Sequence, residues 1–316
     1  MIGVVIPVYK RKKCLIKTLR SLTLQTKQSF YVVIVDDHSP EPLKDTVMSF
    51  SNELHIKYIY LEKNVGPGLA RQAGLEYCYK QNFEFVLFLD SDDFLFPHAL
   101  AKLNYEINKT SSDIVSSEIH IEDNYCLRKN FLASNKTFVH GKMYRTNFLK
   151  QNNITFPSLR TNEDLAFNLK AFGSTDKVAL INEPLHVFHN EPNSITRCGK
   201  NSLNLEIDYI EAIYDAATYL KENRNINNEM ILNIFNCYNC YQTALLLGGK
   251  FSTEQTKHLK WLLALQEFRE GLNNKKNLSL LPEIIQQVVL IDNNLKQFKQ
   301  SFEEWLEENG HVDNCD

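Results

Sequence analysis

The feature that most constrains the fold is an alternation of two sequence patterns along the first two-thirds of the chain. Short, continuous apolar runs alternate with longer segments in which apolar residues recur every three or four positions. The runs are typical of parallel strands buried on both faces, and the spacing is typical of amphipathic helices. We therefore predict an α/β fold with a mostly parallel sheet flanked by helices. The predicted strands are Ile2–Val8, Phe30–Val35, Ile56–Leu61 and Phe83–Leu89, and the predicted helices follow near Leu15–Leu22, Leu69–Lys80 and Pro97–Ile107.

Polar or flexible segments follow all four predicted strands. Because the carboxyl ends of parallel strands meet at one edge of a sheet, and ligands bind beyond that edge, we expect these segments to form a single site. Any one of them alone is equally typical of a solvated turn. The segments are Pro7-Val8-Tyr9, Asp36-Asp37-His38-Ser39, Asn64-Val65-Gly66-Pro67-Gly68 and Asp90-Ser91-Asp92-Asp93.

The pattern changes near residue 200, where helical periodicity replaces the apolar β-type runs. One such segment covers Leu203–Ala217, and a second covers Ile284–Trp305 over about three heptads. The second segment is interpreted either as a coiled-coil seam or as a helix packed on its own domain. We predict an α/β domain at 1–200 that carries the site and an all-helical domain at 201–316, the latter for ligand binding or homo-oligomerisation.

Composition excludes several classes of protein. The formal net charge is -3, so a nucleic-acid partner is not expected, although a basic face on the helical segment would reopen that possibility. The chain has seven cysteines, an odd number. Cys237 and Cys240 lie in a segment with helical periodicity, and we interpret them as two reduced thiols. No stretch is typical of a secretory signal or a transmembrane helix, so we expect a cytoplasmic protein, with peripheral association with the membrane as the alternative.

The acidic segment Asp90-Ser91-Asp92-Asp93 gathers three carboxylates within four residues. Such a cluster is costly unless water or cations neutralise it. Mg²⁺ and Mn²⁺ take oxygen ligands, often one or two carboxylates together with substrate phosphates. The segment therefore predicts a divalent cation held against a diphosphate, and the alternative is an acidic turn that caps the helix beginning near Pro97.

Together these motifs resemble the family 2 glycosyltransferases, which have a GT-A fold. The resemblance covers about residues 1–198, each motif is weak alone, and their common order makes the signal specific. A further segment, His140–Arg145, is similar to bacterial members that build capsule, teichoic-acid or lipopolysaccharide glycans. The matching residues are Val5-Ile6-Pro7-Val8-Tyr9, Val35-Asp36-Asp37-His38-Ser39, Asn64-Val65-Gly66, Ala70-Arg71-Gln72-Ala73-Gly74, Leu89-Asp90-Ser91-Asp92-Asp93 and Asn162-Glu163-Asp164.

The resemblance implies a donor site. Tyr9 would stack on the base of a nucleotide sugar, and Asp37 would accept a hydrogen bond from that base with Asp36 as its structural partner. Arg71 would contact the diphosphate or a carbonyl of the base. The roles of Asp36 and Asp37 are interchangeable at this stage, and Arg71 has the alternative role of a salt bridge on its helix. The expected donor-binding residues are Pro7, Val8, Tyr9, Asp37, Arg71, Asp90 and Ser91.

The resemblance also implies the catalytic and metal-binding residues. Asp164 would be the general base that deprotonates an acceptor hydroxyl, with helix N-terminal acid as its alternative role. Asp92 would be the principal ligand of Mn²⁺ or Mg²⁺. The third ligand is open among His186, His189 and Glu191, and His189 is preferred, although it would serve equally as a structural histidine.

These expectations combine into one function: an inverting, metal-dependent glycosyltransferase that moves a sugar from a UDP-sugar to a hydroxyl of a surface glycan or lipid-linked sugar. One alternative keeps the transfer chemistry and changes the acceptor to a modified DNA base or a protein. A nucleotidyltransferase is a second alternative, although Pro7-Val8-Tyr9 lacks the glycine-rich phosphate loop expected there. The last alternative is a non-catalytic nucleotide-sugar-binding or scaffold protein.

Overall fold

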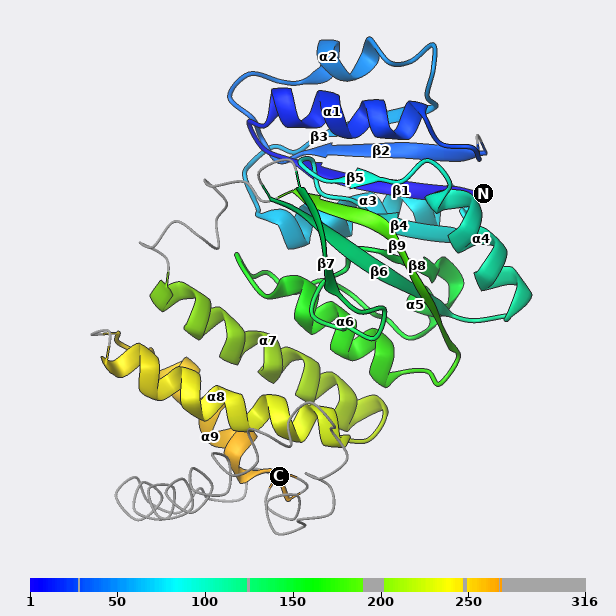
Figure 1. Ribbon diagram of the computed structural model, residues 1–316. Coiled ribbons are helices and arrows are strands. Elements are labelled where there is room, and N and C mark those ends of the chain that lie inside the picture. The colour runs from blue at the N-terminus through cyan, green and yellow to red at the C-terminus, as the bar shows by residue number, and fades with distance from the viewer. Residues whose placement is uncertain (28, 124–125, 190–201, 247–248, 267, 269–316) are drawn as a thin grey trace.

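The computed structural model describes residues 1–268 except 28, 124–125, 190–201, 247–248 and 267. Figure 1 shows a curved sheet with helices on both faces and a group of helices beneath it. The elements follow one another as β1 (Ile2–Val8), α1 (Lys12–Thr23), β2 (Phe30–Asp36), α2 (Lys44–Met48), β3 (Ile56–Tyr60), α3 (Pro67–Lys80), β4 (Phe85–Phe88), β5 (Phe94–Leu95), α4 (Ala99–Lys109), β6 (Ile114–Asp123), β7 (Cys126–Phe131), β8 (Lys142–Arg145), α5 (Thr146–Gln151), α6 (Glu163–Gly173), β9 (Val178–His189), α7 (Ser202–Asn223), α8 (Asn228–Leu246) and α9 (Thr253–Ala264).

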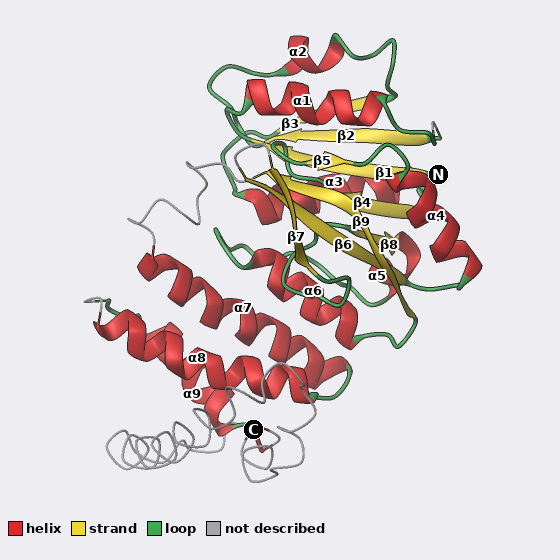
Figure 2. Ribbon diagram, in the orientation of Figure 1, coloured by secondary structure: helices red, strands yellow, loops and turns green. Residues whose placement is uncertain are grey.

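The nine strands form one sheet in the order β3-β2-β1-β4-β8-β6-β9-β5, with β7 paired to β6. The four strands predicted from the sequence are parallel neighbours, which confirms the expected α/β architecture. Beyond β4 the sheet becomes mixed, because β8 is antiparallel to both β4 and β6 whereas β6 and β9 are parallel. Figure 2 shows these strands crossing behind one another as the sheet curls.

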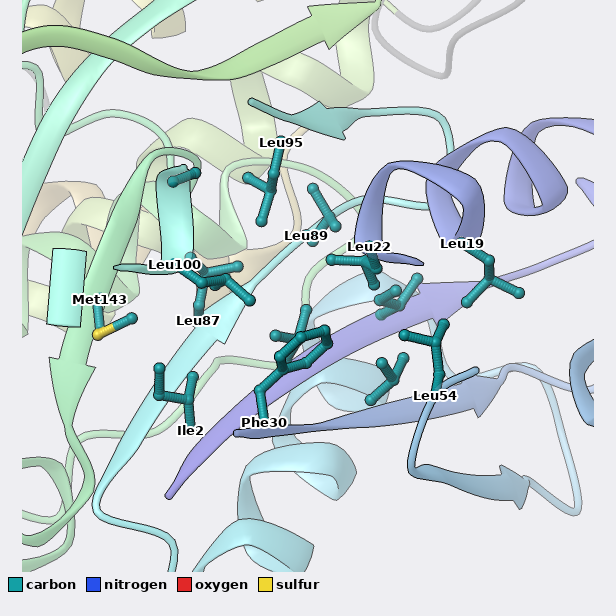
Figure 3. Packing of buried hydrophobic residues seen from close by; sticks show 14 of the residues in the cluster. Ile2, Leu19, Leu22, Phe30, Leu54, Leu87, Leu89, Leu95, Leu100 and Met143 are labelled. Carbon is teal, nitrogen blue, oxygen red and sulfur yellow. The ribbon is translucent and has the colours of Figure 1, made fainter. Parts of the chain in front are cut away.

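Alternation along the central strands divides the core between the two faces of the sheet. Even-numbered residues of β1, such as Val4 and Ile6, pack with α1 and α4, and Figure 3 shows Leu19, Leu22 and Leu100 from these helices over the strands. Odd-numbered residues such as Val5 pack with α3, α5 and α6 on the other face. Strands covered on both faces read as continuous apolar runs, as the sequence predicted for β1, β2 and β4.

The edge strand β3 departs from that prediction. We predicted burial on both faces for Ile56–Leu61, but β3 ends at Tyr60 and no residue of it is fully buried. Its one neighbour is β2, so its outer side lies at the sheet edge. The apolar composition of this segment reflects packing of a few side chains, such as Tyr58, onto the core rather than a central position.

The described part of the C-terminal region is helical. The predicted periodic segment at Leu203–Ala217 forms α7, and α8 and α9 pack beside it. Leu165 and Leu169 of α6 belong to the same apolar cluster as α7, so these helices share a core with the α/β part. The periodic segment Ile284–Trp305, and with it the predicted seam for oligomers, lies outside the described residues.

The helical region bears on two further expectations. Cys237 and Cys240 are free thiols on α8, and burial raises the pKa of both, so they stay protonated as the reduced-thiol interpretation requires. Among the residues that the structure describes, none of the helices combines the length and the apolar character that crossing a membrane requires.

Candidate active site

The carboxyl ends of β1, β2 and β4 lie side by side, because these strands are parallel neighbours. Pro7 and Val8 end β1 and are buried within the sheet. The chain leaves the sheet at Tyr9, whose side chain is 40% exposed with the Lys10 ammonium 4.7 Å from its ring centroid. Tyr9 therefore offers an aromatic face at the rim on which a base or sugar ring could stack.

Asp36 is a structural residue of this rim. Its carboxylate accepts hydrogen bonds from the backbone N–H groups of Ser39 at 2.9 Å and Leu43 at 3.1 Å and from the Tyr58 hydroxyl at 2.6 Å. The side chain is fully buried, so these three donors replace the water it loses. They fix the turn after β2, as expected for the structural member of the aspartate pair.

Asp37 holds the flexible segment that follows β3. One carboxylate oxygen accepts the N–H of Val65 at 2.7 Å, and the other accepts the N–H of Gly66 at 2.9 Å. Burial raises its pKa, and these two hydrogen bonds oppose the rise. Each oxygen keeps a second lone pair, so Asp37 is able to accept one further hydrogen bond from a ligand.

Arg71 lies at the centre of the site, on the first half of α3. Its guanidinium donates to Glu163 at 2.6 Å and to Asp90 at 2.6 Å, and its side chain is 4% exposed. Arg71 thus forms salt bridges, with partners outside its own helix, and its contact with the donor stays a prediction. Glu163 was not singled out from the sequence as a partner of Arg71, because the two are far apart along the chain and no linear spacing joins them.

The three carboxylates of the acidic segment have different partners. Asp90 pairs with Arg71 and lies 3.2 Å from the His140 ring, and these two cations hold its pKa well below the usual range despite burial. Asp92 pairs with Arg11, yet burial and the neighbouring charges of Asp93 and Asp90 raise its pKa to about 7. The positive charge of Arg11 therefore does not fully compensate the negative charges around Asp92, which is the residue predicted to bind a cation.

A buried histidine pair stands behind the acidic segment. His186 Nε2 lies 2.8 Å from the Asp93 carboxylate, and its Nδ1 accepts the Gly141 N–H, so the neutral Nε2–H tautomer fits both contacts. Burial lowers the pKa of His186 accordingly. The His140 ring stacks on it with centroids 4.9 Å apart, and although burial lowers the pKa of His140, Asp90 outweighs this and raises it to about 9.

The strand register brings these groups together. Leu95 of β5 pairs with His186 of β9, which sets Asp93 beside that histidine. Gly141 has a φ of +68°, a conformation that side-chain-bearing residues rarely adopt, and this turn carries His140 into the site. Sequence reasoning missed His140 as a site residue. The signal was present, since His140 opens the segment that resembles bacterial polysaccharide enzymes.

The candidate third ligands fall in different places. His189 donates its backbone N–H to Asp93 at 3.0 Å, and its ring Nδ1 lies 2.7 Å from Glu122, its partner across β6 and β9. Glu191 lies outside the described residues. Within the described residues, the group with metal-ligand geometry is Asp93, His140 and His186, whose ligand atoms lie within 4.8 Å of one another. The predicted metal ligands were Asp92 and His189, and neither belongs to this group.

The donor atoms of the site suit a divalent cation. His140 Nε2 is buried and makes no well-aligned hydrogen bond, although Asp90 is near. Asp92 carries a raised pKa that an added positive charge would lower. Carboxylate oxygens of this kind are suited to Mn²⁺ and Mg²⁺, whereas imidazole ligands favour softer divalent transition metals.

Asp164 is the second residue of α6, at the inner wall of the site. Asn162, the residue just before the helix, has a φ of +60°, which turns the chain into α6. Burial raises the pKa of Asp164, whereas the charges of Arg71 and His140 lower it. A half-buried carboxylate of raised basicity next to Asp90 is suited to accepting a proton. The assignment of Asp164 as the general base stays a prediction.

A buried lysine lies under the same wall and was not predicted. Lys142 on β8 is 1% exposed, and its ammonium donates to the carbonyl oxygens of Phe138 at 2.6 Å and His140 at 3.3 Å. Burial lowers its pKa to about 7, and Asp164 opposes that shift. Lys142 thereby fixes the turn that carries His140. Lys142 lies in the His140–Arg145 segment, but nothing in that segment indicated a buried lysine that binds two carbonyl oxygens.

Solved structures identify the fold class. The chain is similar to the Staphylococcus aureus TarS 1–349 fragment in complex with UDP-GlcNAc, with a TM-score of 0.65 and 23% identity over 85% of this chain and 81% of that one. It is also similar to the mannosyltransferase PcManGT from Pyrobaculum calidifontis in complex with GDP-Man and Mn²⁺, with a TM-score of 0.53 and 15% identity over 85% and 82%. The protein therefore has the GT-A fold, as the sequence predicted.

The family follows from the sequence match. Residues 3–160 match the model described as Glycosyl transferase family 2, and the chain belongs to this family of sugar-transferring enzymes. Among curated relatives, the S. aureus poly(ribitol-phosphate) beta-N-acetylglucosaminyltransferase TarS is 29% identical over 59% of this chain and 35% of its own length. The poly(ribitol-phosphate) beta-glucosyltransferase of Bacillus spizizenii is 25% identical over 93% of this chain and 48% of its own length. The chain thus spans between a third and a half of these relatives.

Proposed function

We propose that this protein is an inverting, metal-dependent glycosyltransferase that transfers a sugar from a UDP-sugar to a hydroxyl group of a surface glycan or lipid-linked sugar. The observation that carries the proposal is the position of Asp164. Asp164 lies in the first turn of α6, and its basic carboxylate is in the same charged group as Arg71 and Asp90, at the rim where Tyr9 and Asp37 follow the ends of β1 and β2.

The donor would bind along the rim. The exposed ring of Tyr9 would stack on the base, and the remaining lone pairs of Asp37 would accept a base N–H. Arg71 is already paired with Asp90 and Glu163, so it would not act as a free cation toward the diphosphate. Its role would be to hold these two carboxylates in position, away from the diphosphate. UDP is the proposed nucleotide because the similar TarS fragment has been solved with UDP-GlcNAc and with UDP.

Asp92 is the proposed ligand for the cation. Asp90 is neutralised by Arg71, and Asp93 is engaged by His186 and by a backbone N–H, whereas Asp92 keeps a raised pKa even beside Arg11. His189 contacts the same segment through its backbone N–H to Asp93, whereas its ring contacts Glu122, and its role as a further ligand stays a proposal from the family resemblance. Mn²⁺ or Mg²⁺, when bound, would stabilise the negative charge that grows on the leaving diphosphate.

Asp164 would take the proton of the acceptor hydroxyl during attack. One positioned carboxylate is sufficient for a single in-line displacement, which inverts the anomeric carbon. The surface-glycan acceptor is proposed because curated relatives are named for transfer to poly(ribitol-phosphate). In this proposal residues 1–200 hold the donor and the base, and residues 201–316 help bind the acceptor.

The test replaces Asp164 with asparagine, which keeps the shape of the side chain and removes the base. Asp164→Asn should bind UDP with wild-type affinity by calorimetry and should lose sugar transfer by at least a hundredfold, since general base catalysis contributes about 10²–10⁴-fold. Asp45→Asn, at an exposed position on α2, is the matched control and should retain both properties. Normal turnover by Asp164→Asn would place the base elsewhere.

A further inference from the structure

The turn that follows β1 carries a run of cations, which are Lys10, Arg11, Lys12 and Lys13. They lead into α1, whose first turn holds no acidic residue. Positive charge at the start of a helix opposes the helix dipole, so the run is unfavourable there unless an anion lies close by. Arg11 contacts such an anion, because its guanidinium pairs with the carboxylate of Asp92.

The backbone holds Arg11 at the rim by contacts of its own. The Lys10 N–H donates to the Ser39 hydroxyl at 2.9 Å, and the Arg11 carbonyl accepts the Leu15 N–H at 2.9 Å as α1 begins. Because β1 and β4 are parallel neighbours, Arg11 after β1 and Asp92 after β4 lie at the same edge of the sheet. A change of partner at Arg11 therefore needs movement of its side chain and not of the turn.

The pair of Arg11 and Asp92 differs from the pairs of Arg71 in its access to solvent. The side chains of Arg11 and Asp92 are 29% and 16% exposed, whereas those of Arg71 and Glu163 are 4% and 7% exposed. A buried guanidinium cannot leave its carboxylate without stranding a charge in the interior. A partly exposed pair contributes little and exchanges its partners readily. Arg11 is therefore able to release Asp92, whereas Arg71 stays with its two carboxylates.

The two members of the exposed pair match the two parts of a metal diphosphate. Asp92 is the proposed ligand of the cation, and two cations on one carboxylate repel each other, so a metal ion and Arg11 would compete for it. A guanidinium released from Asp92 would stay anchored at the start of α1. Its paired N–H groups suit phosphate oxygens. Arg71 cannot supply this contact, because Asp90 and Glu163 occupy its guanidinium.

We propose that Arg11 competes with the divalent cation for Asp92 and binds the diphosphate of the donor once the cation holds that carboxylate. The assignment rests on the proposed function, since it takes Asp92 as the metal ligand and a nucleoside diphosphate as the ligand of the rim. It requires two effects of opposite sign. Arg11 weakens binding of the metal alone, and it strengthens binding of the nucleotide to the protein that holds the metal.

The first measurement is a calorimetric titration of Mn²⁺ without nucleotide. Arg11→Gln removes the competing guanidinium and should bind Mn²⁺ about fivefold more tightly than wild type, the gain expected if the pair leaves about one-fifth of the molecules competent to bind. Arg20→Gln is the matched control, because Arg20 lies on the same helix in an exposed pair with Glu53 at 3.4 Å. It removes the same charge and should bind Mn²⁺ as the wild type does.

The second measurement is a titration of UDP at saturating Mn²⁺. Arg11→Gln should now bind about tenfold more weakly than wild type, the loss expected from one hydrogen bond to a charged group. Arg20→Gln should bind UDP as the wild type does. Both variants should melt close to wild type, because each removes one partner of an ion pair that solvent reaches.

The opposite signs exclude the simpler explanations. A misfolded variant would bind both ligands more weakly, and a general loss of positive charge would shift Arg20→Gln in the same directions. The proposal is overturned if Arg11→Gln binds Mn²⁺ no more tightly than wild type, if it binds UDP no more weakly, or if Arg20→Gln behaves in the same way. A wild type that binds neither Mn²⁺ nor UDP would contradict the proposed function itself, and the role of Arg11 with it.

Discussion

Replacement of Arg71 by methionine tests how the charges of the site are held. Arg71→Met keeps most of the side-chain volume on α3 and removes the guanidinium that joins Asp90 and Glu163, each at 2.6 Å. Removing one partner of a buried ion pair costs about 3–5 kcal/mol, because it leaves an uncompensated charge. Asp90 is 28% exposed and recovers some solvation, so most of the loss comes from Glu163. We expect a loss of about 3 kcal/mol in the free energy of unfolding.

The pH dependence of that loss has a definite sign. Burial and the charge of Asp164 raise the pKa of Glu163 from its ordinary 4.5 to about 7, even with Arg71 present. The folded state therefore binds a proton that the unfolded state releases, and this group lowers stability as pH rises between about 4.5 and 7. Protonated Glu163 needs no cation. The cost of Arg71→Met should consequently be largest near pH 8 and much smaller at pH 5.

Urea unfolding at pH 5 and pH 8 measures both quantities, with the slope of the transition checked against wild type. Arg20→Met is the matched control, because Arg20 forms an exposed pair with Glu53 at 3.4 Å. Surface pairs of this kind contribute about 0–1 kcal/mol. The reasoning is refuted if Arg71→Met costs no more than Arg20→Met at pH 8, or if its cost grows as the pH is lowered.

Three other predictions concern packing, the cation and the base. Gly74→Val should destabilise the protein by about 1–3 kcal/mol in urea unfolding, because even a Cβ on Gly74 would lie 2.3 Å from Val5; unchanged stability would contradict the close packing of α3 on β1. Asp92→Asn should abolish the Mn²⁺ dependence of UDP binding in calorimetry, whereas the ligand-free protein should melt no lower because repulsion with its acidic neighbours is removed; retained metal dependence would exclude Asp92 as the ligand. The kcat of transfer should fall on acidification through the raised pKa of Asp164, and an acid limb at or below an ordinary aspartate pKa of 3.8 would count against its role as the base.

The parallel half of the sheet could be predicted because its signals are local. Ile2–Val8 and Phe30–Asp36 are continuous apolar runs, and a strand buried on both faces leaves no polar position that would obscure the pattern. The second half carries weaker signals, since β8 has four residues and β5 has two. Tertiary contacts decide that these strands pair with β4 and β9. The β-sheet propensity of their residues does not predict this pairing.

The site divides in the same way. Asp90, Asp92 and Asp164 lie in short motifs whose composition reports their chemistry, so the sequence indicated each of them. His140 and Lys142 enter the site only because β8 joins the sheet beside β4, and Glu163 acquires its role from Arg71 across the fold. Contacts between distant segments have no fixed spacing along a chain. The division of the chain into two domains at residue 200 stays a prediction. Apolar side chains of α6 and α7 pack in one cluster, so the core continues across that boundary.

Calorimetric titration of UDP, with and without Mn²⁺, is the most direct test that the rim is a metal-assisted nucleotide site. The account predicts UDP binding that strengthens markedly with Mn²⁺ in the wild type and becomes independent of the metal in Asp92→Asn. It also predicts that Tyr9→Ala, at the exposed end of β1, weakens binding by roughly tenfold, since stacking on a base contributes about 1–3 kcal/mol. Absence of UDP binding under either condition, or binding unaffected by Mn²⁺ and by Tyr9→Ala, would contradict the central claim.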